Sequence, residues 1–195
     1  MSGYVSLSDF DHDPALATEL GNMVVVWAYA EEILIQTLAC ILNAENLDMI
    51  QVLYYRIPTF EARTKVIRGA ISEWNTTVYD KDAIAHLVSK LGKLAVTRNG
   101  WVHGDWCRTS TKPYETVIFN FRVAGDAPDR RRPVKAADVR NHNQAVRARA
   151  KELNQIVGPW IDKYFESRHG LENPQPQHQD SSQPGQPAPP QPSRG

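Results

Sequence analysis

The segment from Pro14 to Ala44 constrains the fold more than any other part of this chain, because it is long and strongly apolar. Large apolar side chains recur every three or four residues along it, at Leu16, Leu20, Met23, Val24, Trp27, Leu34, Leu38, Ile41 and Leu42. This spacing is typical of one face of an α-helix that runs for many turns. Asp13 stands where a capping residue is expected, and Pro14 suits the first turn. The segment therefore predicts a long helix.

The same segment is long enough to suggest a membrane-spanning helix. Glu31 and Glu32 lie in the middle of its most apolar stretch, Met23 to Leu42, and a carboxylate at the centre of a bilayer is energetically costly. The residues from Met1 to Asp13 carry acids and no base, which is unlike a signal peptide. We therefore expect a soluble, cytoplasmic protein that does not contact a membrane.

Further segments have helical periodicity, and one has strand periodicity. The expected helices are residues 47–56, ending before Pro58; 60–74, preceded by Thr59; 81–99; and 136–165, in which Pro159 should cause a kink or a break. Apolar residues alternate from Val117 to Val123, which indicates a strand. With a turn at Lys112-Pro113, this strand is expected to form a hairpin near residues 106–124. The sequence thus predicts an all-α, antiparallel helical bundle with one inserted β-hairpin.

Composition changes abruptly near Gly170. Residues 171–195 are rich in Pro, Gln, Ser and Gly and have almost no large apolar side chain. Such a segment cannot bury enough apolar surface to offset the entropy lost on ordering. We expect a single helical domain over residues 1–170 and a disordered tail over residues 171–195.

Charge is distributed unevenly although the formal net charge is zero. Residues 1–50 hold eight acids and no Lys or Arg, whereas residues 130–170 hold ten bases and four acids. The two regions could attract each other within the fold or across a dimer, or the basic region could face phosphates. The pattern slightly favours the first interpretation. Arg130 to Arg132 are interpreted as part of a solvated loop.

The sequence contains no P-loop, dinucleotide-binding glycine motif, nucleophile elbow or His-Glu-x-x-His element. The six histidines and the two cysteines, Cys40 and Cys107, lack the spacing of metal ligands. The sequence therefore predicts no metal site and no cofactor. His142 is expected on the surface of the last helix, and both cysteines are expected to be reduced and structural.

One segment groups side chains that can perform chemistry: Thr97-Arg98-Asn99-Gly100-Trp101-Val102-His103-Gly104. A guanidinium is a planar, permanently charged group that suits phosphate oxygens. An imidazole is the side chain best suited to proton transfer near neutral pH. Together they could cleave RNA without a metal, because the imidazole would transfer protons while the guanidinium stabilises the charge that develops on the phosphate.

Helix geometry restricts how these groups can meet. At about 100° per residue, Arg98 and His103 lie about 140° apart on a regular helix. Asn99 and His103 are one turn apart and share a face. The guanidinium and the imidazole therefore converge only if the helix ends or distorts, for which Asn99-Gly100 is a candidate position, or if a second subunit contributes.

The pattern Arg98-Asn99-x-x-x-His103 at the end of a bundle helix resembles the Arg-x(4–6)-His motif of HEPN domains, and the resemblance covers roughly residues 15–165. It implies an all-α fold and a homodimer that places two motifs in one cleft. Many such domains are metal-independent endoribonucleases of toxin–antitoxin, phage-defence or CRISPR systems, and others are non-catalytic binding or assembly modules. The inserted hairpin is not part of the common HEPN core.

Two functions follow from this resemblance. The first is an endoribonuclease in which His103 is the acid–base group, Arg98 stabilises the phosphate and Asn99 has a positioning role, with Glu31, Glu32 and Trp101 in support. The second is a non-catalytic dimerisation module or an RNA- or nucleotide-binding scaffold. Either function fits an antitoxin or another protein as partner.

The residues also have purely structural interpretations. Arg98 and His103 would be a helix-end cation and a core histidine, and Asn99 would be a helix cap. Trp101 is expected in the core or an interface, and one of Glu31 and Glu32 is expected to point inward.

Overall fold

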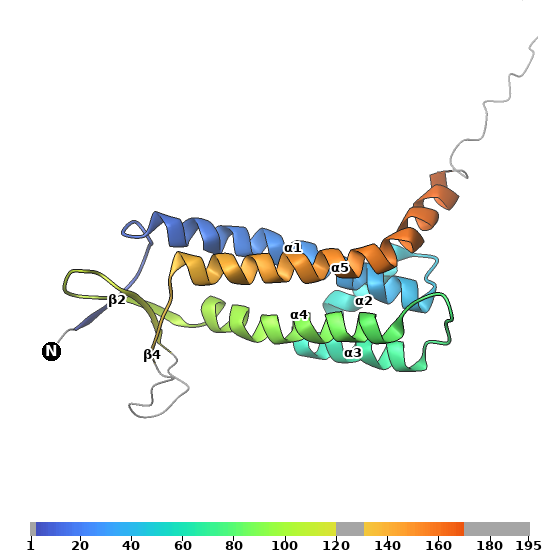
Figure 1. The fold of residues 1–195 in the computed structure, drawn as a ribbon, viewed down its shortest axis with the longest axis horizontal. Coiled ribbons are helices and arrows are strands. Elements are labelled where there is room, and N and C mark those ends of the chain that lie inside the picture. The colour runs from blue at the N-terminus through green and yellow to red at the C-terminus, as the bar shows by residue number, and fades with distance from the viewer. Residues whose placement is uncertain (1–2, 120–130, 170–195) are drawn as a thin grey trace, which may run out of the picture.

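The computed structural model describes residues 3–119 and 131–169, which form five helices and four short strands (Figure 1). The helices are α1 (Pro14–Leu42), α2 (Leu47–Arg56), α3 (Phe60–Glu73), α4 (Lys81–Val102) and α5 (Ala136–His169). The strands are β1 (Tyr4–Ser6), β2 (Asp105–Thr109), β3 (Thr116–Phe119) and β4 (Arg131–Pro133). The predicted tail and residues 120–124 of the predicted hairpin lie outside the described residues.

The first four helices begin at side chains that cap them. In each case the oxygen of the N-cap side chain accepts a hydrogen bond of 2.9–3.1 Å from the backbone amide three residues later. This bond satisfies one of the amides that a helix start leaves without an intrahelical partner. The four caps are Asp13, Asn46, Thr59 and Asp80. The helix starts predicted from the sequence are confirmed.

The helices α1 and α5 lie side by side along the length of the bundle, and α4 runs along them (Figure 1). Near their starts, Asn143 of α5 donates a hydrogen bond to the Glu19 carbonyl of α1. Beyond the end of α1, Asn43 accepts one from Trp160 near the end of α5. The two helices are therefore parallel, which corrects the prediction of a wholly antiparallel bundle. By contrast α4 is antiparallel to both helices and to α3.

Burial inside the bundle accounts for the apolar composition of α1. This helix is long and apolar enough to cross a membrane by length and composition, and 61% of its most apolar window is buried inside the structure. Its inward residues join the main core formed with the other four helices. A second apolar cluster lies where the bundle meets the sheet and contains Leu16, Met23, Trp101, Ile118, Val134 and Val139.

The predicted hairpin is confirmed within the described residues, since β2 and β3 pair antiparallel with Trp106 opposite Ile118. Lys112-Pro113 lies in the connection between them. The sequence analysis missed two strands, β1 and β4. They extend the sheet to the order β1-β2-β3-β4. The expectation of a solvated loop at Arg130 to Arg132 is wrong for Arg131 and Arg132, which are exposed but belong to β4, while residue 130 lies outside the described residues. Each of the two strands is only three residues long, and all of these residues are exposed. Neither strand therefore has the alternation of buried and exposed side chains by which a strand is recognised in a sequence.

The last helix, α5, extends to His169, a few residues beyond its predicted end. Pro159 lies inside it and does not divide it. Figure 1 shows that α5 changes direction in its C-terminal part. This bend agrees with the predicted kink, because proline removes one backbone hydrogen bond from a helix.

Candidate functional site

The candidate motif lies at the C-terminal end of α4, where the helix is regular. The helix continues through Asn99-Gly100 to Val102, and His103 is its C-cap. The backbone amide of His103 donates to the Asn99 carbonyl at 3.0 Å, as in an uninterrupted helix. The helix therefore neither ends nor distorts at Asn99-Gly100. On such a helix Arg98 and His103 are attached about 140° apart, so within one chain they start from different sides of α4.

Arg98 is half-buried between α4 and α1. Its guanidinium carbon lies 5.7 Å from the centre of the Trp27 ring, a cation–π distance. Its Nη1 donates a hydrogen bond of 3.0 Å to Oδ1 of Asn99. The guanidinium is therefore held at a fixed place beside Asn99.

Asn99 and His103 are both exposed and lie one turn apart on α4. Asn99 thus connects the two ends of the motif, because its side chain accepts from Arg98 and its carbonyl accepts from the His103 amide. The structure brings Arg98 and Asn99 together and leaves the imidazole of His103 accessible to solvent.

The motif lies on a part of the bundle that α3 does not cover. Figure 1 shows α3 alongside only the part of α4 that is remote from the sheet. The first residue of α3, Phe60, has its ring 4.9 Å from that of Trp27. On the uncovered parts of α1 and α4, Val24, Val25 and Val102 are 65%, 70% and 44% exposed.

The two glutamates of α1 differ in environment. Glu31 points inward, and its Oε1 accepts from Nη1 of Arg63 in α3 at 2.6 Å. Glu32 is exposed and accepts a hydrogen bond from Gln36. The prediction that one of the pair points inward is confirmed. The inward residue is bound to Arg63, and among the described residues neither glutamate forms an ion pair with Arg98 or His103.

Trp101 lies in the core, 5% exposed, as predicted. Its carbonyl accepts from the Trp106 indole at 2.9 Å, and its ring meets that of His142 edge-on at 4.9 Å. His142 is only 7% exposed, so the expectation of a surface histidine is wrong. The sequence does contain a pattern that indicates this burial, because His142 lies between Val139 and Val146 at helical spacing on the inner face of α5. Burial lowers the pKa of His142 below its usual value.

A polar cluster joins the starts of α1 and α5, in which Glu19 and Asn143 are buried and Arg140 is exposed. The carboxylate of Glu19 accepts a hydrogen bond of 2.8 Å from Nε of Arg140, and Asn143 donates to the Glu19 carbonyl at 2.9 Å. The acidic and basic regions of the sequence thus attract each other within the fold at this contact. The Arg140 hydrogen bond lowers the pKa of Glu19, and those from Asn22 and Asn143 act in the same direction against burial.

This lowered pKa predicts acid sensitivity. A carboxyl group with a lowered folded-state pKa stabilises the protein above its unfolded value of about 4.5, and this stabilisation is lost as the pH falls through the folded-state value. We expect wild type to lose more stability than Glu19→Gln between neutral pH and about pH 3. Urea unfolding midpoints measured at both pH values check this, and equal losses in the two proteins would contradict it.

Both cysteines, Cys40 and Cys107, are buried and free, as expected. The described residues contain no group of three or more His, Cys, Asp or Glu side chains arranged to hold a metal ion. No protein-family model, curated protein or solved structure matches the chain.

Proposed function

We propose that this protein is a homodimeric, metal-independent endoribonuclease of the HEPN type. The observation that carries the proposal is the arrangement at the end of α4: a guanidinium fixed by Asn99, and an exposed imidazole one turn beyond. Val24 and Val25 of α1 and Val102 of α4 are exposed, and in this proposal they contact a second copy. Since Arg98 and His103 of one chain start from different sides of the helix, the second copy completes the site.

In this mechanism each group has one task. The imidazole of His103 removes the proton from a ribose 2′-hydroxyl, and the 2′-oxygen attacks the adjacent phosphorus. The bond from phosphorus to the 5′-oxygen breaks, and that oxygen gains a proton from an imidazole. The guanidinium of Arg98 binds the non-bridging oxygens as their charge grows, while Asn99 holds the guanidinium. The products are a 2′,3′-cyclic phosphate and a 5′-hydroxyl end. A neutralising protein, as in a toxin–antitoxin or phage-defence pair, would act by covering this site.

Cleavage of single-stranded RNA in the presence of a chelator tests the chemistry. We expect His103→Ala and Arg98→Ala each to lower the rate by about 100-fold or more, the range typical of a lost acid–base group or charge stabiliser. His86→Ala is the matched control, because His86 is another exposed histidine of α4. It should retain wild-type activity and the cyclic-phosphate end. Equal cleavage by wild type and the two motif variants would reject the proposal.

The mass in solution tests the dimer. We expect twice the chain mass of 22.0 kDa for wild type and a monomer for Val24→Glu, because a charge at the apolar interface would have to be desolvated. The monomeric variant should also lose RNA cleavage. Val78→Glu is the control, since Val78 is 81% exposed in the segment between α3 and α4 and should not affect association. A wild-type monomer would exclude the two-copy site.

A non-catalytic scaffold is the second candidate, and one observation favours it. The Arg98 guanidinium already has two partners, the Trp27 ring and the Asn99 amide, as expected for a side chain that joins α4 to α1. In that case Arg98→Ala would lower stability while wild type would bind RNA and leave it intact. A gel that shows shifted, uncleaved RNA therefore separates the two functions.

A further inference from the structure

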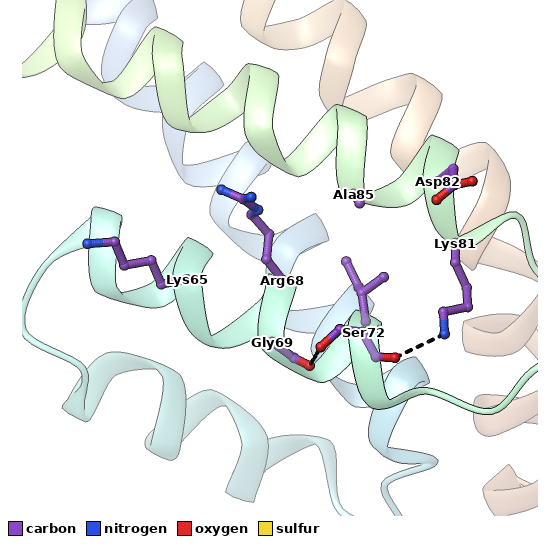
Figure 2. A pocket seen from close by; sticks show the side chains of 8 residues that line it. Lys65, Arg68, Gly69, Ser72, Lys81, Asp82 and Ala85 are labelled. Carbon is purple, nitrogen blue, oxygen red and sulfur yellow. Dashed lines mark hydrogen bonds between the residues drawn. The ribbon is translucent and has the colours of Figure 1, made fainter.

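A groove between α3 and α4 lies at a distance from the motif and has a volume of about 520 Å³ (Figure 2). Lys65 and Arg68 of α3 line it together with Lys81 and Asp82 of α4. The groove therefore has three cationic side chains and one carboxylate. Its size is within the range of ligand sites, about 300–1,000 Å³.

Among these cations, Arg68 is the one available to bind a ligand. Lys81 donates to the Ser72 and Trp74 carbonyls at 3.3 and 2.6 Å, and so caps the C-terminal end of α3. Lys65 forms an exposed ion pair with Glu61. Arg68 is exposed and extends from α3 toward α4 (Figure 2). Within the described part of the chain, no hydrogen bond or ion pair engages it.

The floor of the groove favours phosphate over a nucleobase. Gly69 and Ala85 keep the space between the helices open, and a Cβ atom added at Gly69 would meet no atom within 4 Å. None of the described residues that line the groove is aromatic, so a base has no ring on which to stack. A guanidinium in an open, basic groove suits the charged oxygens of a phosphodiester instead.

Beyond the groove, exposed residues of α4 lie on the same side of the helix toward the motif. Lys93, Val96, Gly100 and His103 lie within about 40° of Ser89 around this helix, and all four are exposed. From Ala85 to His103 the helix rises by about 27 Å, which is enough for several nucleotides. A strand bound at Arg68 can therefore follow α4 past Lys93 to the imidazole.

We propose that this groove binds the sugar–phosphate backbone of single-stranded RNA, with Arg68 as the main contact, and directs the strand along α4 to His103. The choice of RNA as ligand rests on the proposed function. The contact is to phosphate, so binding is independent of base sequence and weakens with salt.

Fluorescence anisotropy with a labelled 2′-O-methyl RNA strand tests this, because the strand lacks the 2′-hydroxyl needed for cleavage. We expect Arg68→Ala to weaken binding several-fold and to reduce the slope of log K against log salt by about 0.7, the value for one phosphate contact on a single strand. Arg147→Ala is the matched control, because Arg147 is an exposed arginine of α5 without a partner in the described residues. It should bind like wild type.

The outcomes separate the groove from the nuclease. Equal affinity of Arg68→Ala and Arg147→Ala, or no binding by wild type, overturns the groove proposal even if RNA cleavage is intact. Displacement of the strand by inorganic phosphate at equal phosphate concentration also overturns it, because the site would then hold a free ion. A selective loss of binding in Arg68→Ala supports the groove even if wild type cleaves no RNA, and that combination rejects only the nuclease.

Discussion

Replacing Arg63 by methionine is expected to lower the free energy of unfolding by about 3 kcal/mol, the lower end of the cost of breaking a buried ion pair, because the pair with Glu31 is part-buried. Arg63 donates from Nη1 to Glu31 at 2.6 Å and from Nε to the Ile57 carbonyl at 3.0 Å. Its guanidinium also lies 4.9 and 5.2 Å from the ring centres of Tyr54 and Tyr55. The side chains of Arg63 and Glu31 are only 14% and 17% exposed. The variant would leave the Glu31 carboxylate without its cation in a part-buried site.

A second ion pair of α3 provides the control for this measurement. Lys65 and Glu61 are 71% and 77% exposed, so Lys65→Met should cost less than about 1 kcal/mol. The double variant Arg63→Met/Glu31→Met should recover much of the loss, because no unpaired charge remains buried. Urea unfolding of the four proteins gives the comparison. Similar costs for Arg63→Met and Lys65→Met would show that the buried pair has no special role.

Gly104→Ala is expected to cost about 3 kcal/mol, at the upper end of the usual cost of overpacking. Gly104 connects α4 to β2, and a Cβ atom there would overlap Cγ2 of Ile118 and lie 2.6 Å from the backbone carbonyl of Gly100. The Ile118 side chain belongs to the apolar cluster that holds the sheet against the bundle. A backbone carbonyl inside a helix has little freedom to move, so the end of α4 must shift.

Gly100→Ala is the matched control for Gly104→Ala, four residues earlier in the chain. A Cβ atom at Gly100 would meet nothing within 4 Å, and the residue lies inside α4. Alanine there should stabilise the protein by about 0.5–1 kcal/mol, because it restricts the unfolded chain and favours helix. Thermal unfolding of both variants measures the two effects, which should have opposite signs. A destabilising Gly100→Ala would contradict the open environment of that residue.

Local signals in the sequence were sufficient for most of the helical structure. A helix start depends on the capping side chain and the residues that follow within one turn, so Asp13 and Thr59 could be recognised directly. The same holds for the spacing of apolar residues in α1. At the candidate site, the sequence predicted the positions of Arg98 and His103 around a regular helix, because 3.6 residues per turn fix them.

Capping residues and apolar spacing do not predict contacts between segments that are far apart in the sequence. The short strand β4 forms because its backbone groups pair with β3, and the side chains of Arg131 and Arg132 are exposed. The ion pair of Glu31 with Arg63 could not be predicted from local sequence either, since Arg63 lies in another helix. The groove at Arg68 likewise arises from two helices, and α4 alone does not suggest it.

The order of the amino acids was enough to locate the helix starts, the apolar faces of the helices and the side chains at the end of α4, because these properties depend on neighbours within a turn or two. The parallel direction of α1 and α5, the burial of His142 and the absence of α3 beside the motif emerged from the folded structure alone. Helix direction and coverage depend on how large apolar surfaces from remote segments fit together. Such burial has no fixed spacing along the chain.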